Sequence, residues 1–310
     1  MNTAVIEAHI ARLSDTMHRQ LANTRGHCWL LLDPAIRPVG QDSPLGCLLA
    51  DRTCFTAPSM ADIDVTMMPQ IIAFDPAKAR DHDLVWQSLS EALVELAPDM
   101  LAQGVGRRIG GWLESDADGP QLALHIASQM IQRNAQGRRR LLRWADPAVL
   151  WALWPILNGQ QQSALLGPIK AYRLLDPAGH WHCLRAPHDA KGEALGLDSR
   201  QWQRIEAIAA LNGVLREQSL SAHSPQSLCQ LRDTLMAALE EARHFGFADS
   251  RDQTAYARRA LAIHPAFARH PLVAERLAKR KPDDYFSALI DDLSAGQWAG
   301  IQRDCSKSAS

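Results

Sequence analysis

The chain has 310 residues, of which 46% are hydrophobic and 22% charged, and its formal net charge is −1. This composition excludes wholesale disorder, and the near-neutral charge gives no electrostatic case for nucleic-acid binding. The length suits one large domain or two ordinary ones. Six cysteines without a C-x-x-C pair indicate reduced thiols rather than a disulfide framework. Since the N-terminus lacks the apolar core of a signal peptide and no apolar run approaches the ~18 residues of a spanning helix, we expect a cytoplasmic protein.

Helix and strand signals alternate through the first 185 residues. Apolar residues recur at helical spacing in 6–21 and 83–97, and again after Asp118-Gly119-Pro120. Short apolar runs predict strands at 28–32, 46–50, 71–74 and 109–114, and an alternating stretch begins at Asp62. Residues 1–185 are therefore predicted to form an α/β (α+β) lobe with a mixed sheet.

The segment 138–181 is the best-marked part of this lobe. It predicts a strand that ends at Trp144, and then a helix begun by Asp146-Pro147, since Asp is a good N-cap and Pro suits the first helical position. Pro155 should end or kink this helix. A second short helix closes at Gly167-Pro168, and strands follow at 169–175 and 180–184.

Asp-Pro pairs recur after predicted strands in this part of the chain, at Asp33, Asp75, Asp146 and Asp176. Asp caps the turn or helix that follows, and Pro ends the β ladder. The repetition predicts one α/β unit whose strands stop at a common edge.

The pattern changes after Leu184. Residues 186–198 are polar and rich in turn formers, and we interpret them as a linker. Residues 199–301 show helical periodicity throughout and predict an all-α lobe. The small, polar residues 302–310 predict a flexible tail. The nine Trp are expected to be mainly core or half-buried side chains.

Signals for chemistry are weak. His180 and His182 would share one face of a strand, but Cys183 points away and no second ligand pair lies nearby. The glycines of 104–111 have a helix before and a strand after, the reverse of a dinucleotide-binding loop. The basic run Arg138–Arg140 could contact an acidic partner, although a solvated strand entrance is the simpler interpretation. We therefore expect no catalytic residue, no metal site and no cofactor.

Four short motifs occur together in the first lobe. An aromatic-aliphatic-Leu-Leu-Asp strand occurs as Trp29–Asp33. The run Arg-aromatic-x-Asp-Pro-x-x-Leu occurs as Arg143–Leu150, followed by Leu153-Trp154-Pro155 and Leu166-Gly167-Pro168. In this combination the chain resembles the type VI secretion effector adaptor (chaperone) family, catalogued as domain of unknown function 4123 (DUF4123). The residues that carry the resemblance, all with expected structural roles, are Asp33, Arg143, Trp144, Asp146, Pro147, Leu150, Pro155, Gly167 and Pro168.

The resemblance extends into the helical part, through Trp202, the His244–Gly246 and Asp249 region, and Phe267 with His270-Pro271. It implies a cytoplasmic carrier rather than an enzyme or a membrane-embedded protein. Such a carrier binds a toxic effector, often through its N-terminal or membrane-inserting segment, and helps to load it onto the VgrG spike. No nucleic acid is expected as a partner.

Two alternatives remain open from the residues alone. One is an enzyme on the α/β scaffold, such as a hydrolase that uses His180. The other, weaker one is a nucleic-acid binder that uses Arg138–Arg140.

Overall fold

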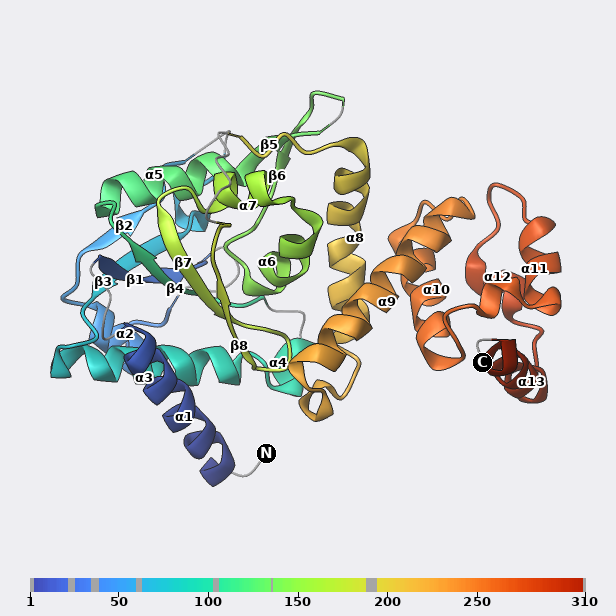
Figure 1. Cartoon of the computed structure of the whole chain (residues 1–310), viewed down its shortest axis with the longest axis horizontal. Coiled ribbons are helices and arrows are strands. Elements are labelled where there is room, and N and C mark those ends of the chain that lie inside the picture. Colours follow the sequence, from blue (N-terminus) through green and yellow to red (C-terminus); the bar gives the residue numbers. More distant parts are fainter. Residues whose placement is uncertain are drawn as a thin grey trace. The chain divides into compact units, whose positions relative to one another are not determined.

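In the computed structural model the described residues are 3–21, 26–34, 39–59, 63–102, 106–134, 136–187 and 194–308. The chain divides into two compact units, Met1–Trp202 and Gln203–Ser310 (Figure 1). The first is an α+β unit and the second is helical in its described residues, as the sequence predicts. Residues 188–193 of the predicted linker 186–198 lie outside the described residues.

A six-stranded sheet forms the centre of the N-terminal unit. Its strand order is β2-β3-β1-β4-β7-β8, and every neighbouring pair runs antiparallel. The predicted mixed sheet is thus wrong in this detail, because no two neighbouring strands are parallel. The strands are β1 (His27–Leu32), β2 (Cys54–Thr56), β3 (Gln70–Phe74), β4 (Ile109–Ser115), β7 (Ile169–Leu175) and β8 (Trp181–Leu184).

Helices cover both faces of this sheet (Figure 1). One face packs against α1 (Thr3–Leu21) and α3 (Ala79–Val94). The other face packs against α5 (Gly119–Met130), α6 (Pro147–Leu153) and α7 (Gly159–Leu166). Shorter helical pieces complete the unit: α2 (Pro44–Leu49), α4 (Pro98–Ala102), and the 3₁₀ turns η1 (Val65–Met67) and η2 (Trp154–Ile156).

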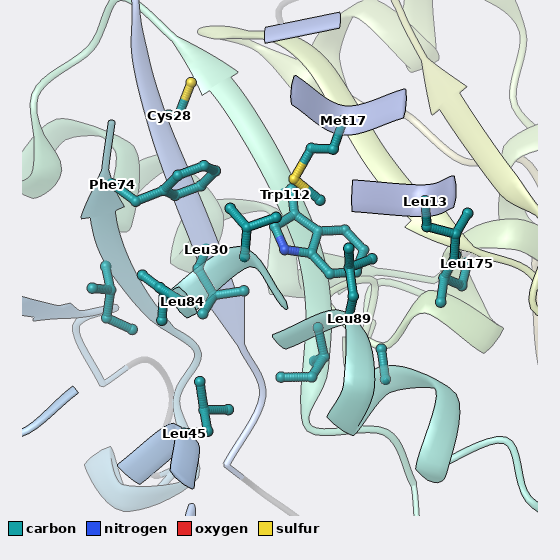
Figure 2. Close-up of a cluster of buried hydrophobic side chains, with 14 of the residues drawn as sticks. Leu13, Met17, Cys28, Leu30, Leu45, Phe74, Leu84, Leu89, Trp112 and Leu175 are labelled. Carbon is teal, nitrogen blue, oxygen red and sulfur yellow. The ribbon is translucent and has the colours of Figure 1, made fainter. Parts of the chain in front are cut away.

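The core between the sheet and the first pair of helices is continuous. Figure 2 shows Leu13 and Met17 of α1 and Leu89 of α3 gathered around Trp112 of β4. The indole N–H of Trp112 donates to the buried Ser88 hydroxyl at 2.9 Å, so the largest side chain of this core leaves no unsatisfied donor.

Two strand predictions fail for a local reason. Residues 46–50 lie largely in helix α2, because Pro44 occupies the first helical position and the Ser43 hydroxyl accepts the Gly46 N–H at 3.0 Å. The alternating stretch before β3 contains the 3₁₀ turn η1, which Asp64 caps through the Thr66 N–H. In both places a short polar cap outweighs the apolar pattern.

The strand predicted to end at Trp144 is much shorter than expected. Only Arg139–Leu141 is extended, as β6, and it pairs with β5 (Ile131–Arg133) in a separate two-stranded sheet. The chain then runs without regular structure through Trp144 into α6, which begins after the Asp146 cap as predicted.

The second unit begins inside α8 (Ser199–Leu215) and has an aromatic core. Tyr256 lies at its centre, with ring centroids 4.9 Å from Phe267 and 5.1 Å from Phe286. Its other helices and turns are η3 (Leu220–Ala222), α9 (Pro225–His244), α10 (Ser250–Ala262), η4 (Phe267–Arg269), α11 (Pro271–Ala278), α12 (Phe286–Ile290) and α13 (Ala295–Ser308).

The C-terminal residues differ from the sequence prediction. Where a flexible tail is predicted from 302, helix α13 continues to Ser308. Ile301 is fully buried, Cys305 is 8% exposed, and the Arg259 guanidinium lies 4.3 Å from the centre of the Trp298 ring. Three widely spaced residues on one face therefore anchor a helix whose remaining positions are small and polar.

Candidate functional site

The residues that carry the family resemblance converge at one edge of the sheet, where β1 and β7 end and β4 begins. Leu32 at the end of β1 lies opposite Ile109 at the start of β4. Next to it, the Arg143 guanidinium donates to the Asp33 carboxylate at 2.6 Å. The Asp33 side chain is 3% exposed, so this ion pair joins the segment before α6 to the end of the central strand.

Asp146 lies beside this pair. Its carboxylate accepts the Ala148 N–H at 2.8 Å and so caps α6, as predicted. Burial raises the pKa of Asp146, while the positive charges of Arg107 and Arg143 oppose that rise. The carboxylate is thus used both as a helix cap and as a counter-charge.

Arg107 is the buried cation of this edge, with 6% of its surface exposed. Its guanidinium donates to the backbone carbonyls of Leu175 and Asp176, at 2.8 and 3.5 Å. Burial lowers the pKa of Arg107, and the negative charges of Asp146, Asp176 and Glu95 act in the opposite direction. One guanidinium therefore ties the end of β7 to the start of β4.

Arg108 forms a second buried connection. Its Nε donates to Glu95 at 2.8 Å, and its guanidinium also bonds Glu91. The other Glu95 oxygen accepts the backbone N–H groups of Arg108 and Ile109, at 3.0 and 3.3 Å. Burial raises the pKa of Glu95, and the contacts with Arg108 counteract that rise. This network attaches the end of α3 to β4.

Sequence reasoning missed Arg107 and Arg108, since it considered them only as part of a glycine-rich loop. The signal that could have found them is a pair of adjacent arginines directly before a buried strand. Two such charges need carboxylate partners in the fold.

The other motif residues shape the chain around this edge. Trp144 and Leu150 are fully buried, and the Trp144 ring lies 6.0 Å from that of Tyr172. Pro147 takes the first position of α6, and Pro155 lies in the 3₁₀ turn that ends this helical segment. None of these motif residues has an ionisable or nucleophilic side chain.

Gly167 and Pro168 end α7 and start β7. Gly167 has φ 51°, a region that L residues with a side chain rarely occupy, and a Cβ there would overlap the His125 imidazole. The Pro168 carbonyl accepts the Ser115 hydroxyl at 2.9 Å. These two residues thus fix the sharp entry into β7.

The predicted common edge holds for Asp33 and Asp176, which follow β1 and β7, and Asp146 reaches the same edge from a segment that follows no strand of this sheet. Asp33, Asp146 and Asp176 lie around Arg107 and its neighbours. Asp75 follows β3, which runs antiparallel to β1, so it lies at the opposite edge of the sheet. Reversal of the strand direction explains the error.

His180 and His182 share one face of the chain, as predicted, and both contact a buried carboxylate. His180 Nδ1 and His182 Nε2 lie 3.0 and 2.8 Å from the same oxygen of Asp176, whose side chain is fully buried. Burial alone would raise the pKa of Asp176, but hydrogen bonds from His182 and from the His180 N–H bring it below its ordinary value. The histidines stabilise the β7–β8 turn.

Open space for a ligand lies elsewhere in the described residues. A cavity of about 610 Å³ lies at the opposite edge, bordered by His18, Cys28, Arg52, Phe74 and Asp81 among others. Another, of about 550 Å³, lies in the helical unit beside His264, Arg269, His270 and Cys305. Neither cavity is lined by Asp33, Arg107 or Arg108, or by the carboxylates that contact these arginines.

Other features bear on partners. In the described ranges, no group of three or more His, Cys, Asp or Glu side chains is arranged to hold a metal ion. No helix of the described chain combines the length and apolar character needed to cross a membrane.

The prediction that the Trp are core or half-buried is confirmed: Trp29, Trp112, Trp144, Trp151, Trp202 and Trp298 are buried, and Trp86, Trp154 and Trp181 are partly buried.

Comparison with known proteins identifies one family. Residues 28–164 match the family model described as Domain of unknown function (DUF4123). No curated protein and no solved structure matches the chain. The matched range starts in β1 and ends within α7, so it includes Asp33 and the whole of Arg143–Leu150.

Proposed function

We propose, from the match of residues 28–164 to the family model described as Domain of unknown function (DUF4123), that this chain is an effector adaptor of type VI secretion. It acts in the cytoplasm as a carrier: it binds one effector, through its N-terminal or membrane-inserting segment, and helps to load that effector onto the VgrG spike. The family match is the observation that carries this proposal. A physical reason also supports it, since apolar effector segments need shielding from water before secretion.

The family-motif residues act as structural residues in this proposal. Asp33 and Arg143 bond each other across the unit, Asp146 caps α6, and Trp144 and Leu150 are buried. These structural contacts support a scaffold role. The partner surface lies on other residues.

The contacts of His180 and His182 fit a carrier better than they fit a hydrolase. A hydrolytic His needs a nucleophile within hydrogen-bond reach and a site for substrate. Among the described residues, the ring nitrogens of His180 and His182 bond only Asp176, and neither described cavity includes them. These contacts favour the carrier over a hydrolase that uses His180.

Co-expression tests the proposal. The probe is the effector encoded beside this gene, produced with this protein or with an Arg143→Leu variant that lacks the Asp33 partner. We expect the wild-type protein to co-purify with the effector and to raise its soluble yield several-fold. An effector that is equally soluble alone, and that does not co-purify, would overturn the proposal.

A further inference from the structure

The β5–β6 hairpin stands out from the rest of the N-terminal unit (Figure 1). Its turn is firmly built: the Asn134 side chain accepts the N–H groups of Gln136 and Arg138, at 3.1 and 2.9 Å. Gly137, with φ 73°, donates its N–H to the Asn134 carbonyl. A hairpin held in this way presents its side chains in fixed positions.

Four arginines project from this hairpin without a counter-charge. Arg133, Arg138, Arg139 and Arg140 are all exposed. None of them forms an ion pair with a carboxylate of the described chain, although the protein as a whole has a net charge of −1. The hairpin is thus a concentrated positive patch on a nearly neutral protein.

Two of these arginines face each other. Arg133 lies directly opposite Arg139 in the register of the hairpin. The ladder bonds Asn134 N–H to Arg138 O and Leu142 N–H to Met130 O identify the hydrogen-bonded pairs. By alternation, Arg133 and Arg139 form a non-hydrogen-bonded pair, in which side chains approach most closely. Like charges in such a pair are destabilising, so folding of the hairpin does not explain them.

Apolar side chains share that face of the hairpin. Ile131 lies opposite Leu141, two positions from the arginine pair, and 47% of the Leu141 surface is exposed. A face that combines arginines with an exposed Leu is typical of protein interfaces rather than of nucleic-acid contacts alone.

The outer edge of β6 is open to a further strand. In a non-hydrogen-bonded pair the N–H and C=O groups point away from the partner strand, so those of Arg139 and Leu141 point outward. No described residue bonds them. On the other side, the Trp202 indole N–H donates to the Arg133 carbonyl at 3.1 Å and covers part of the β5 edge. Of the two edges of the hairpin, the β6 edge thus leaves its outward backbone groups without a partner among the described residues.

We propose that the β6 edge binds an extended, acidic segment of a partner protein, which adds to the hairpin as a third strand. Backbone groups of Arg139 and Leu141 would pair with the segment, carboxylates would lie beside the arginines, and an apolar residue would cover Leu141. This surface goes beyond the proposed function, which assigns no contact residues.

Peptide binding tests this surface on the full-length protein. The probe is a labelled, end-capped peptide with three consecutive Glu flanked by Val and Thr. Its matched probe has Lys in place of Glu, and a third probe carries N-methyl groups on alternate amides, which blocks strand pairing. We expect the acidic probe to bind most tightly, with an affinity that falls as salt rises. Equal binding of the acidic and basic probes would overturn the proposal, and so would undiminished binding of the N-methylated one.

Charge reversal supplies the variant. The double variant Arg139→Glu with Arg140→Glu should bind the acidic probe at least tenfold more weakly than wild type does. It should also bind the Lys probe more tightly than the acidic one. The control, Arg12→Glu with Arg200→Glu, changes two exposed arginines outside the hairpin and should bind as wild type does. Thermal unfolding verifies that both variants fold. A single-stranded DNA oligonucleotide that binds more tightly than the acidic peptide would contradict the proposal in favour of nucleic acid.

The outcome is separable from the adaptor role. If the hairpin variant loses the peptide while the wild-type protein fails to bind its effector, the adaptor proposal falls and the hairpin surface stands. If the effector complex forms but the acidic peptide never binds, the hairpin proposal falls and the adaptor proposal stands.

Discussion

At the scale of single residues, Asp33 shows how a buried charge is retained in this fold. Its carboxylate lies at the end of the central strand, and the Arg143 guanidinium, about 30% exposed, compensates it from another segment. Such a pair adds little to stability relative to apolar residues of the same shape. Removing one partner is costly, however, because the remaining charge stays buried. The two positions are therefore coupled, and each constrains the other.

Replacement of Arg143 measures this coupling. We expect Arg143→Leu to lower the free energy of unfolding by about 3 kcal/mol, since Asp33 then stays buried without this counter-charge. Arg12→Leu, at an exposed position, should change it by less than about 0.5 kcal/mol. Urea unfolding gives both values. A double variant that also carries Asp33→Leu should lose less than the sum of the single changes, and strict additivity would contradict the coupling.

Gly167 tests a backbone requirement. We expect Gly167→Ala to destabilise the protein by about 1–3 kcal/mol, because Ala is strained at φ 51° and its Cβ meets His125. Gly213→Ala is the matched control: it lies inside α8 with open space around it, so Ala should stabilise by about 0.5–1 kcal/mol. Differential scanning calorimetry separates the two signs. Equal effects at both glycines would disprove the requirement.

The lowered pKa of Asp176 predicts that the free energy of unfolding depends on pH in the acid range. Since its pKa is lower in the folded protein, its ionised form adds stability above the pKa of the unfolded chain, about 3.9, and this contribution is lost as pH falls through the folded value. The stability advantage of wild type over Asp176→Asn should therefore shrink between pH 5 and pH 3. The nearby groups His180, His182 and Arg107 are present in both proteins. An advantage that stays constant down to pH 3 in urea titrations contradicts this.

At the scale of elements, local caps explain which parts of the fold the sequence predicts well. Helix α5 begins at its predicted place because Asp118 accepts the Gln121 N–H. At α2 the apolar run favours a strand, but the Ser43-Pro44 start makes it a helix. The charge network of Arg107 and Arg108 could not be predicted, since the carboxylates around it come from other segments of the chain. Long-range pairing, and not local propensity, limits the prediction of the site.

Helix α13 gives an element-scale test. We expect Ile301→Ala to destabilise the protein by about 2–5 kcal/mol, because the side chain is fully buried. Gln302→Ala, at an exposed position of the same helix, should change the free energy of unfolding by less than about 0.5 kcal/mol. Chemical unfolding monitored by circular dichroism provides the comparison. If Ile301→Ala has no larger effect than its neighbour, the helix does not pack as described.

At the scale of the whole molecule, the family match includes both buried and exposed features. The matched range 28–164 contains the ion pair of Asp33 with Arg143 and also the hairpin from which the arginines of β6 project. The motif residues of the sequence indicate the family, and the expected solvated position of Arg138–Arg140 is confirmed. The pairing of Arg133 with Arg139 depends on strand register and is visible only in the fold.

Secretion of the effector tests the adaptor role most directly. In a strain that secretes the neighbouring effector, this gene is deleted and then restored from a plasmid, and effector in the medium is measured together with a second substrate of the same secretion system. The account predicts that deletion abolishes release of the neighbouring effector alone and that the plasmid restores it. Unchanged release of that effector after deletion would contradict the account.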